Sequence, residues 1–202
     1  MAITRKRETT EVRQQQIVEA AQKLIFKYGS EHLTVKRISA EVGISEAAIY
    51  RHFKSKRSIL SFLLINIEKV LIEDISRKRT GEEILTLETI ENTIQKHFSV
   101  IDIRKGVAFQ VIAEIISLGD KGLNKKTSMT ISKYISGLRD LLAEGVKSGC
   151  VRKDIDLDAA AMLLFSMIQS VVNIWALQNC NFQLIEKYKS LWLVFREAIT
   201  PR

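Results

Sequence analysis

The fold of this chain is decided by residues 34–60, which read TVKRISAEVGISEAAIYRHFKSKRSIL. Thr34 and Ser45 are good N-cap residues, and each stands before a short run with apolar residues at helical spacing. Between the two runs, Gly43 supplies the left-handed residue that ends a helix. Two short helices separated by such a turn predict a helix-turn-helix.

The second helix of this pattern has two different faces. At about 100° per residue, Ile49 and Phe53 lie on one side, and we expect them to pack on the helix that precedes the motif. The opposite side presents Ala47, Arg51 and Lys54. One small residue and two cations suit close approach to a DNA major groove and its phosphates.

Composition places this motif in an all-α protein. The chain has 202 residues, 46% of them hydrophobic, and its one proline, Pro201, stands next to the end. Long stretches without proline favour uninterrupted helices. Residues 1–58 hold 12 Lys and Arg against 6 Asp and Glu, and so carry most of the formal net charge of +8. This asymmetry favours a polyanionic partner for the first part of the chain.

We therefore predict about nine helices in two domains, a helix-turn-helix domain over 1–57 and a helical domain over 58–202. A first helix ends at Gly29, and Ser55 caps the fourth. In the larger domain Gly81 marks a break and residues 119–122 are the expected flexible loop. Apolar periodicity predicts its further helices over 87–101, 107–118, 131–142, 158–178 and 182–199.

Several classes of protein are disfavoured. Cys150 and Cys180 are too few for a disulfide framework or a zinc site, and no nucleophile–base pair, catalytic carboxylate pair or phosphate-binding loop is present. We expect no enzyme activity, no cofactor and no metal. The apolar stretch 159–177 has four polar residues in one stripe, which is typical of a helix buried between others, so no membrane partner is expected. Without a targeting segment, the expected location is cytoplasmic, at the nucleoid.

Residues 34–60 closely resemble the DNA-binding signature of the TetR/AcrR family of bacterial regulators. Ser39 stands where that family more often has alanine, and residues 45–53 are also similar to its nucleoid-occlusion branch. A weaker likeness covers residues 149–160, similar to the family's entry to its penultimate helix. The strong likeness is carried by Ile38, Ala40, Gly43, Ile44, Ser45, Tyr50, His52, Phe53, Lys54, Ser55 and Lys56.

The resemblance implies roles for ten residues on double-stranded DNA. The implied phosphate contacts are Thr34, Tyr50, His52, Lys54 and Lys56. The implied base or groove contacts are Lys36, Ser45, Glu46, Ala47 and Arg51. Some alternatives stay open: Tyr50 as a half-buried core aromatic, Lys56 as a solvated surface lysine, Glu46 as a carboxylate that only stabilises a helix terminus, and Arg51 as a contact to phosphate in place of a base. The arm Arg5–Arg7 fits phosphates, a minor groove or a solvated tail.

The resemblance also implies a small-molecule pocket and a two-fold interface in the larger domain. The expected pocket residues are His97, Phe98, Phe109, Gln110, Glu114, Met129 and Phe165, which favour a small, mainly hydrophobic effector. The expected interface residues are Met162, Gln169, Asn173, Trp175, Leu191, Trp192 and Phe195. Both sets are also compatible with an ordinary core or a solvent-facing edge.

The function that follows is a homodimeric repressor that holds a near-palindromic operator and is released by its effector. The alternative is an architectural, nucleoid-associated DNA-binding protein that needs no effector. An enzyme or a carrier of small apolar molecules is the third and least favoured class.

Overall fold

The computed structural model describes residues 9–29, 32–75 and 85–201, without the side chains of residues 73 and 74. The basic arm at 5–7 and the expected break at Gly81 lie outside these ranges. The described residues form nine helices and no strand, which confirms the predicted all-α class. The helices are α1 (Thr10–Tyr28), α2 (Val35–Val42), α3 (Glu46–His52), α4 (Lys56–Ile75), α5 (Leu87–Ile103), α6 (Val107–Ser117), α7 (Lys121–Ser148), α8 (Leu157–Leu177) and α9 (Leu184–Ile199).

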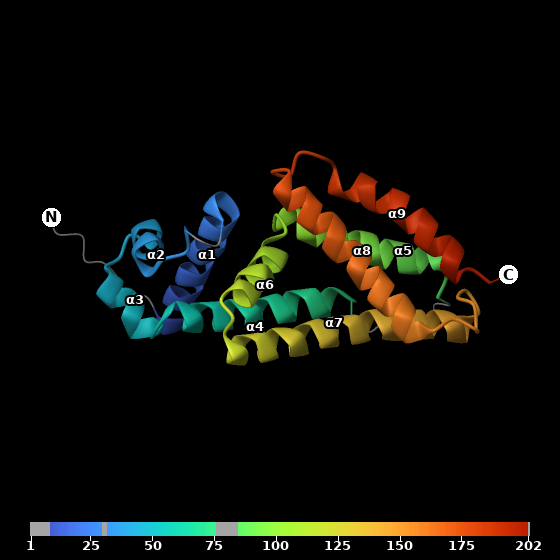
Figure 1. Cartoon of the computed structure of the whole chain (residues 1–202), viewed down its shortest axis with the longest axis horizontal. Coiled ribbons are helices and arrows are strands. Elements are labelled where there is room, and N and C mark those ends of the chain that lie inside the picture. Colours follow the sequence, from blue (N-terminus) through green and yellow to red (C-terminus); the bar gives the residue numbers. More distant parts are fainter. Residues whose placement is uncertain (1–8, 30–31, 76–84, 202) are drawn as a thin grey trace.

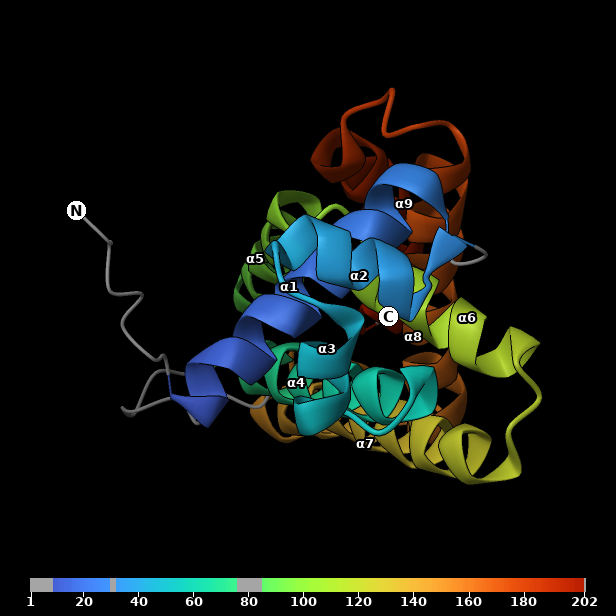
Figure 2. The same cartoon turned by 90° about the vertical axis from the view of Figure 1, so that its left-hand side faces the viewer.

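Helices α1 to α3 form a small head at one end of the elongated molecule (Figures 1 and 2). The caps are those that the sequence predicts: Thr34 Oγ1 accepts from the Arg37 amide at 3.2 Å, and Ser45 Oγ accepts from the Ala48 amide at 3.2 Å. Gly43 has a φ of 73°, which turns the chain between α2 and α3. Ile49 and Phe53 are buried, so α3 packs its apolar side inward and leaves the other side to solvent.

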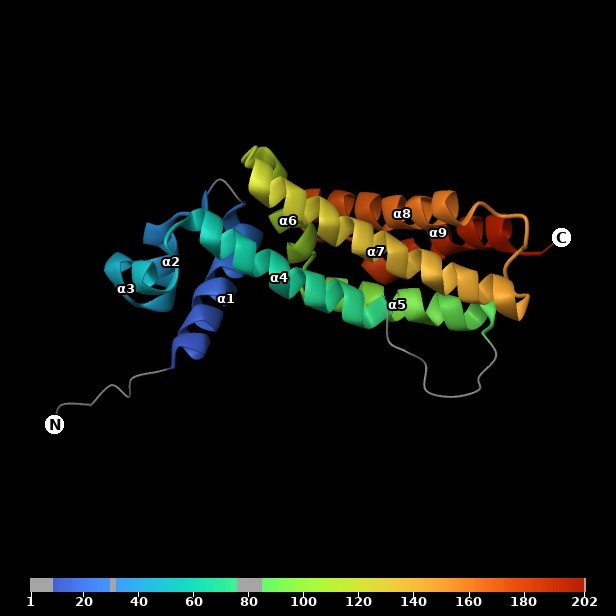
Figure 3. The same ribbon diagram turned by 90° about the horizontal axis from the view of Figure 1, so that it is seen from below.

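Helix α4 joins the head to the larger part of the molecule. Ser55 and Ser58 cap its start reciprocally, since each side-chain oxygen accepts from the other residue's amide, at 3.1 and 3.3 Å. From there α4 runs as one helix out of the head and alongside α7 (Figure 3). The boundary predicted at residue 57 therefore falls in the first turn of a continuous helix.

The larger part surrounds an aromatic core between α5, α8 and α9. Phe98 stacks on Tyr188 with 4.5 Å between ring centroids, and Trp175 and Trp192 are buried. Gly106, before α6, has a φ of 63°, and a Cβ there would lie 3.0 Å from the Val172 side chain. The start of α6 is thus packed tightly against α8.

One predicted segment is wrong in detail. The loop expected over 119–122 is shorter, because Asp120 caps α7 by accepting from the Leu123 amide at 2.8 Å. Lys121 and Gly122 are therefore helical, and α7 starts ten residues before the predicted apolar stripe at 131. The early turns of α7 carry several lysines, which concealed the helix from an apolar pattern.

Within the described ranges, α8 is the one helix that is long and apolar enough, by length and composition, to cross a membrane. Core helices of soluble proteins pass the same test. Its side chains Ala161, Leu164 and Ile168 are buried, and α8 packs against both α7 and α9.

Candidate nucleic-acid interface and ligand cavity

The outer face of α3 carries most of the residues expected on base edges. Ser45, Glu46, Ala47 and Arg51 are all exposed there. Tyr50, on the same short helix, is 51% exposed, so about half of its side chain is open to solvent and accessible to a phosphate. These side chains stand on a helix whose opposite side is anchored in the head, so the surface they form is held in one orientation.

The remaining expected contacts lie around α3. Thr34, Lys36 and Lys54 are exposed, while His52 and Lys56 are partly buried. Within the described part of the chain, His52 Nδ1 is buried without a hydrogen-bond partner. Lysine, hydroxyl and imidazole side chains of this kind, spread around the edge of a head, suit the phosphates on either side of a groove.

Lys56 is not the solvated lysine that one reading of the sequence allows. Its Nζ lies 2.7 Å from Glu114 Oε1 on α6, and the Glu114 carboxylate is buried. The next residue, Arg57, pairs through Nε with Asp120 Oδ2 at 3.0 Å. The first turn of α4, next to the exposed face of α3, is therefore tied to two carboxylates of the larger part.

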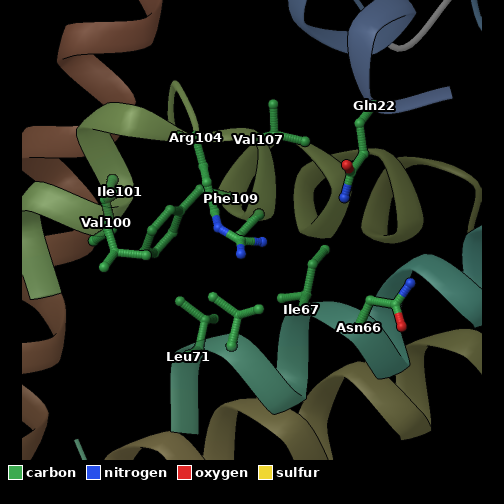
Figure 4. A pocket seen from close by; sticks show the side chains of 12 residues that line it. Gln22, Asn66, Ile67, Leu71, Val100, Ile101, Arg104, Val107 and Phe109 are labelled. Carbon is green, nitrogen blue, oxygen red and sulfur yellow. The ribbon is translucent and has the colours of Figure 1, made fainter. Parts of the chain in front are cut away.

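A cavity of about 130 Å³ lies where the head meets the larger part. Helices α4, α5 and α6 form most of its wall, and α1 of the head contributes Gln22 (Figure 4). The wall is mainly apolar, with Ile67, Leu71 and Phe109 among its residues. The guanidinium of Arg104 points into this space (Figure 4). Such a cavity suits an apolar ligand with a polar or anionic end.

Comparison with known proteins places the chain in a family. Residues 17–61 match the family described as bacterial regulatory proteins, tetR family. Residues 67–197, well over half of the chain, match the family described as YsiA-like protein, C-terminal region. The chain belongs to the TetR family of bacterial regulators. The resemblance drawn from residues 34–60 is confirmed, and so is the reading as a DNA-binding transcriptional regulator.

Relatives of this TetR-family chain include a fatty acid regulator and nucleoid occlusion factors. The fatty acid metabolism regulator protein of Bacillus subtilis is 29% identical over 84% of this chain and 87% of its own length. The nucleoid occlusion factor SlmA of Vibrio atlanticus is 26% identical over 93% of this chain and 95% of its own length. The crystal structure of the regulator FadR of Bacillus subtilis in complex with stearoyl-CoA is 25% identical, covers 92% of this chain and 98% of that one, and has a TM-score of 0.73.

Most residues expected in the TetR-type pocket lie elsewhere. Phe109 lines the cavity; Gln110 follows it on α6 but is not part of the wall. His97 and Phe98 are buried, with His97 Nε2 2.7 Å from the Tyr134 hydroxyl and Phe98 against Tyr188. The physical reason is that these side chains already fill the core they were expected to line.

The other three expected pocket residues lie outside the cavity wall, each in different surroundings. The Glu114 carboxylate forms an ion pair with Lys56, and the Met129 side chain is 54% exposed on the outer side of α7. Phe165 packs edge-on against Tyr134, with 5.7 Å between ring centroids. None of the three lines the cavity.

The residues expected at the dimer interface fall into a buried group and a more exposed group. Trp175, Trp192 and Phe195 are buried within the protomer's own core. Gln169 donates to Asn173 at 3.0 Å, and both lie with Met162 toward the outside of α8, while Leu191 is half-buried. The large apolar residues of α8 and α9 that are half or more exposed are Met162, Leu163, Ile174, Leu177, Leu193 and Val194. We call these six residues the α8–α9 face.

Sequence reasoning missed the polar residues of the cavity, Gln22, Asn66 and Arg104. Asn66 left a usable signal, since it interrupts the otherwise apolar stretch around Leu63 and Ile67. Gln22 and Arg104 left none, because one belongs to the head and the other follows a helix end.

Proposed function

We propose that the chain is a homodimeric repressor whose two heads place α3 in successive major grooves of a near-palindromic operator. The observation that carries this is the exposed outer face of α3, with Ala47 and Arg51, on a head that a continuous α4 joins to the larger part. One such head makes few contacts, and two heads about 34 Å apart multiply the affinity. The proposed site of action is the nucleoid, in the cytoplasm, and no enzyme activity is proposed.

The test begins with a DNA sequence that the protein itself chooses. Wild-type protein enriches duplexes from a random library long enough for two half-sites, and the most enriched sequence is called the selected duplex below. Enrichment of a near-palindrome with half-sites about one helical turn apart supports the proposal. Enrichment of no sequence over a random duplex contradicts it.

Replacing Tyr50 by alanine is expected to weaken binding by about tenfold on the selected duplex and on its single-base variants alike. The proposed role of this hydroxyl is a phosphate contact, which carries no sequence information. Replacing Ala47 by glutamine is expected instead to change the preferred base, toward adenine at one position of each half-site. Gel-shift titrations over a panel of variant duplexes measure both effects. A Tyr50→Ala loss confined to one base position would contradict the phosphate role.

We propose a fatty acyl thioester as the effector that fills the cavity. The relatives named as fatty acid regulators, one of them solved with stearoyl-CoA, support this class. So does the cavity itself, with an apolar wall and Arg104 at hand for a phosphate or carbonyl oxygen. The cavity of about 130 Å³ is close to the roughly 150 Å³ that holds one benzene molecule. A long acyl chain therefore has to separate α6 from α4, and this supplies the change that releases DNA.

Replacing Arg104 by methionine is expected to weaken stearoyl-CoA binding by about tenfold, because the aliphatic stem remains and the charge-assisted bonds are lost. Calorimetry measures the affinity, and the ligand-induced rise in melting temperature gives an independent readout. Free CoA without an acyl chain is the control ligand and is expected to bind far more weakly. Equal binding of stearoyl-CoA by wild type and Arg104→Met would remove Arg104 from the proposed site.

The second candidate is an architectural DNA-binding function at the nucleoid. The similarity to SlmA of Vibrio atlanticus over 93% of the chain favours it. A genome-wide map of bound DNA separates the two. A few sites upstream of lipid-metabolism genes support the repressor, and many dispersed sites support the architectural protein.

A further inference from the structure

The ion pairs at the start of α4 join a DNA-binding surface to the wall of the cavity. Lys56 occupies the first helical position of α4, where free backbone amides and the helix dipole already favour an anion. Its ammonium nevertheless lies 2.7 Å from Glu114, and 30% of its side chain is exposed. A DNA phosphate would reach Lys56 from that exposed side.

The Glu114 carboxylate depends on this cation. Its side chain is 7% exposed, and among the described residues the cation paired with it is Lys56. A buried carboxylate loses its hydrating water on folding, and its counter-charge offsets the cost of that loss. Without the counter-charge the cost is not offset. Transfer of the Lys56 charge to a phosphate therefore costs free energy at Glu114, so the protein's own carboxylate and the DNA compete for one ammonium group.

Glu114 also belongs to the helix that senses the cavity. Val107, Ala108 and Phe109, in the first turn of α6, line the cavity, and Glu114 lies about two turns further along the same helix. A ligand that moves the first turn moves the Glu114 carboxylate relative to Lys56. The second pair, Arg57 with Asp120, spans the same junction but is more exposed, with 60% of the arginine side chain accessible.

We infer that Glu114 is a positioning residue for DNA binding, which withdraws Lys56 from the phosphate and makes its release depend on where α6 stands. This inference rests on the proposed DNA-binding function and adds the group through which the larger part controls it. Asp120 acts on Arg57 in the same sense, with a smaller effect because solvent screens that pair.

Replacing Glu114 by glutamine removes the competing charge and keeps the shape of the side chain. We expect it to tighten binding to the selected duplex by about fivefold, an effect of the size of one partly buried ion pair. In wild type, the carboxylate that Lys56 leaves behind recruits a cation from solution and offsets one counterion released from the DNA. The plot of log affinity against log salt is therefore expected to be steeper by about 0.9 in Glu114→Gln.

Glu68→Gln is the matched control. Glu68, on α4, accepts from Thr130 at 2.7 Å and pairs with Lys133, and these hydrogen bonds, the one from Lys133 foremost, lower the pKa of its carboxyl. Glu68→Gln changes the net charge by the same amount as Glu114→Gln and also removes an ion pair. That ion pair lies away from the first turn of α4. We expect Glu68→Gln to leave the affinity within twofold of wild type and the salt slope unchanged. An equal gain in both variants would show a net-charge effect and overturn the inference.

A double-mutant cycle with Lys56→Gln provides the decisive comparison. In the Lys56→Gln background, Glu114→Gln is expected to bring no further gain in affinity. If it brings the full fivefold gain, Glu114 acts through another group and the inference is wrong. Asp120→Asn keeps a side chain that can still cap α7, and it is expected to tighten binding by about twofold. An unchanged affinity in both Asp120→Asn and a folded Glu114→Gln also overturns the inference. Failure of wild type to prefer the selected duplex over random DNA would instead refute the DNA-binding function itself.

Discussion

A protein carrying Leu163→Glu together with Val194→Glu is expected to be a monomer and to bind the selected duplex at least a hundredfold more weakly than wild type. Leu163 is 55% exposed on α8 and Val194 is 71% exposed on α9, and both belong to the α8–α9 face. In a two-fold dimer each substitution occurs twice, which places four carboxylates in one apolar interface. Separation of the protomers turns the second half-site contact from an intramolecular event into a bimolecular one, which costs about 10²–10⁴ in affinity.

Analytical ultracentrifugation gives the oligomeric state, and gel shifts on full and half sites give the DNA affinity. Met129→Glu is the control, because Met129 is similarly exposed at 54% but lies on α7, outside the α8–α9 face. We expect this control to remain a dimer with unchanged operator affinity. A dimeric double variant with normal binding would show that the two copies meet through another surface.

Trp192→Ala is expected to destabilise the fold by about 3–5 kcal/mol, the usual cost of truncating a buried tryptophan. Trp192 is fully buried, with its ring 6.2 Å from that of Tyr188 and 5.7 Å from that of Phe195 between centroids. Loss of the indole leaves a cavity that these neighbouring rings cannot close, because Phe98 already holds Tyr188 on its other side.

Urea unfolding at a fixed protomer concentration measures this loss, since dimer stability depends on concentration. Met129→Ala, at an exposed site, is expected to change the free energy of unfolding by less than about 0.5 kcal/mol. If Trp192→Ala instead unfolded like wild type but dissociated into monomers, the tryptophan would belong to the interface that the sequence pattern first indicated.

These two experiments distinguish a helix face that packs in the protomer's own core from one that meets a second copy, which apolar periodicity cannot do. Leu191, Trp192 and Phe195 recur at helical spacing, and the same spacing arises whether a stripe faces the protomer's own core or a second copy. Only the crossing of α8 over α9 decides that the tryptophans point inward and that Leu193 and Val194 point out. The pair of helices was predictable from the sequence, and the assignment of its faces was not.

The head could be predicted almost completely because its determinants are local. Thr34 and Ser45 cap helices through amides three residues away, and Gly43 turns the chain by its own φ. The exposed side of α3 then follows from helical geometry once Ile49 is buried. Which bases and phosphates these side chains contact stays a prediction, because no local rule contains the DNA.

The cavity could not be predicted, because its wall combines residues that are distant in sequence. Gln22 comes from the head, Asn66 from the middle of α4 and Arg104 from the end of α5. Their meeting depends on how three helices cross. Of the two polar residues of α6 expected in the pocket, Glu114 is paired with Lys56 and Gln110 lies outside the cavity wall. Glu114 is the clearest case, since a carboxylate on an apolar helix predicts a ligand contact, and in the structure its partner is Lys56 on α4.

The close approach of Gly106 to Val172 holds the start of α6 against α8, and towards its other end Glu114 is held by Lys56. We therefore expect a ligand that presses on the first turn near Phe109 to tilt α6 about its contact with α8. In such a tilt the opposite end of α6 moves furthest, and the Glu114 carboxylate lies near that end. A larger side chain at position 106 would displace the start of α6 from α8. We expect such a variant to bind DNA and no longer to respond to its effector.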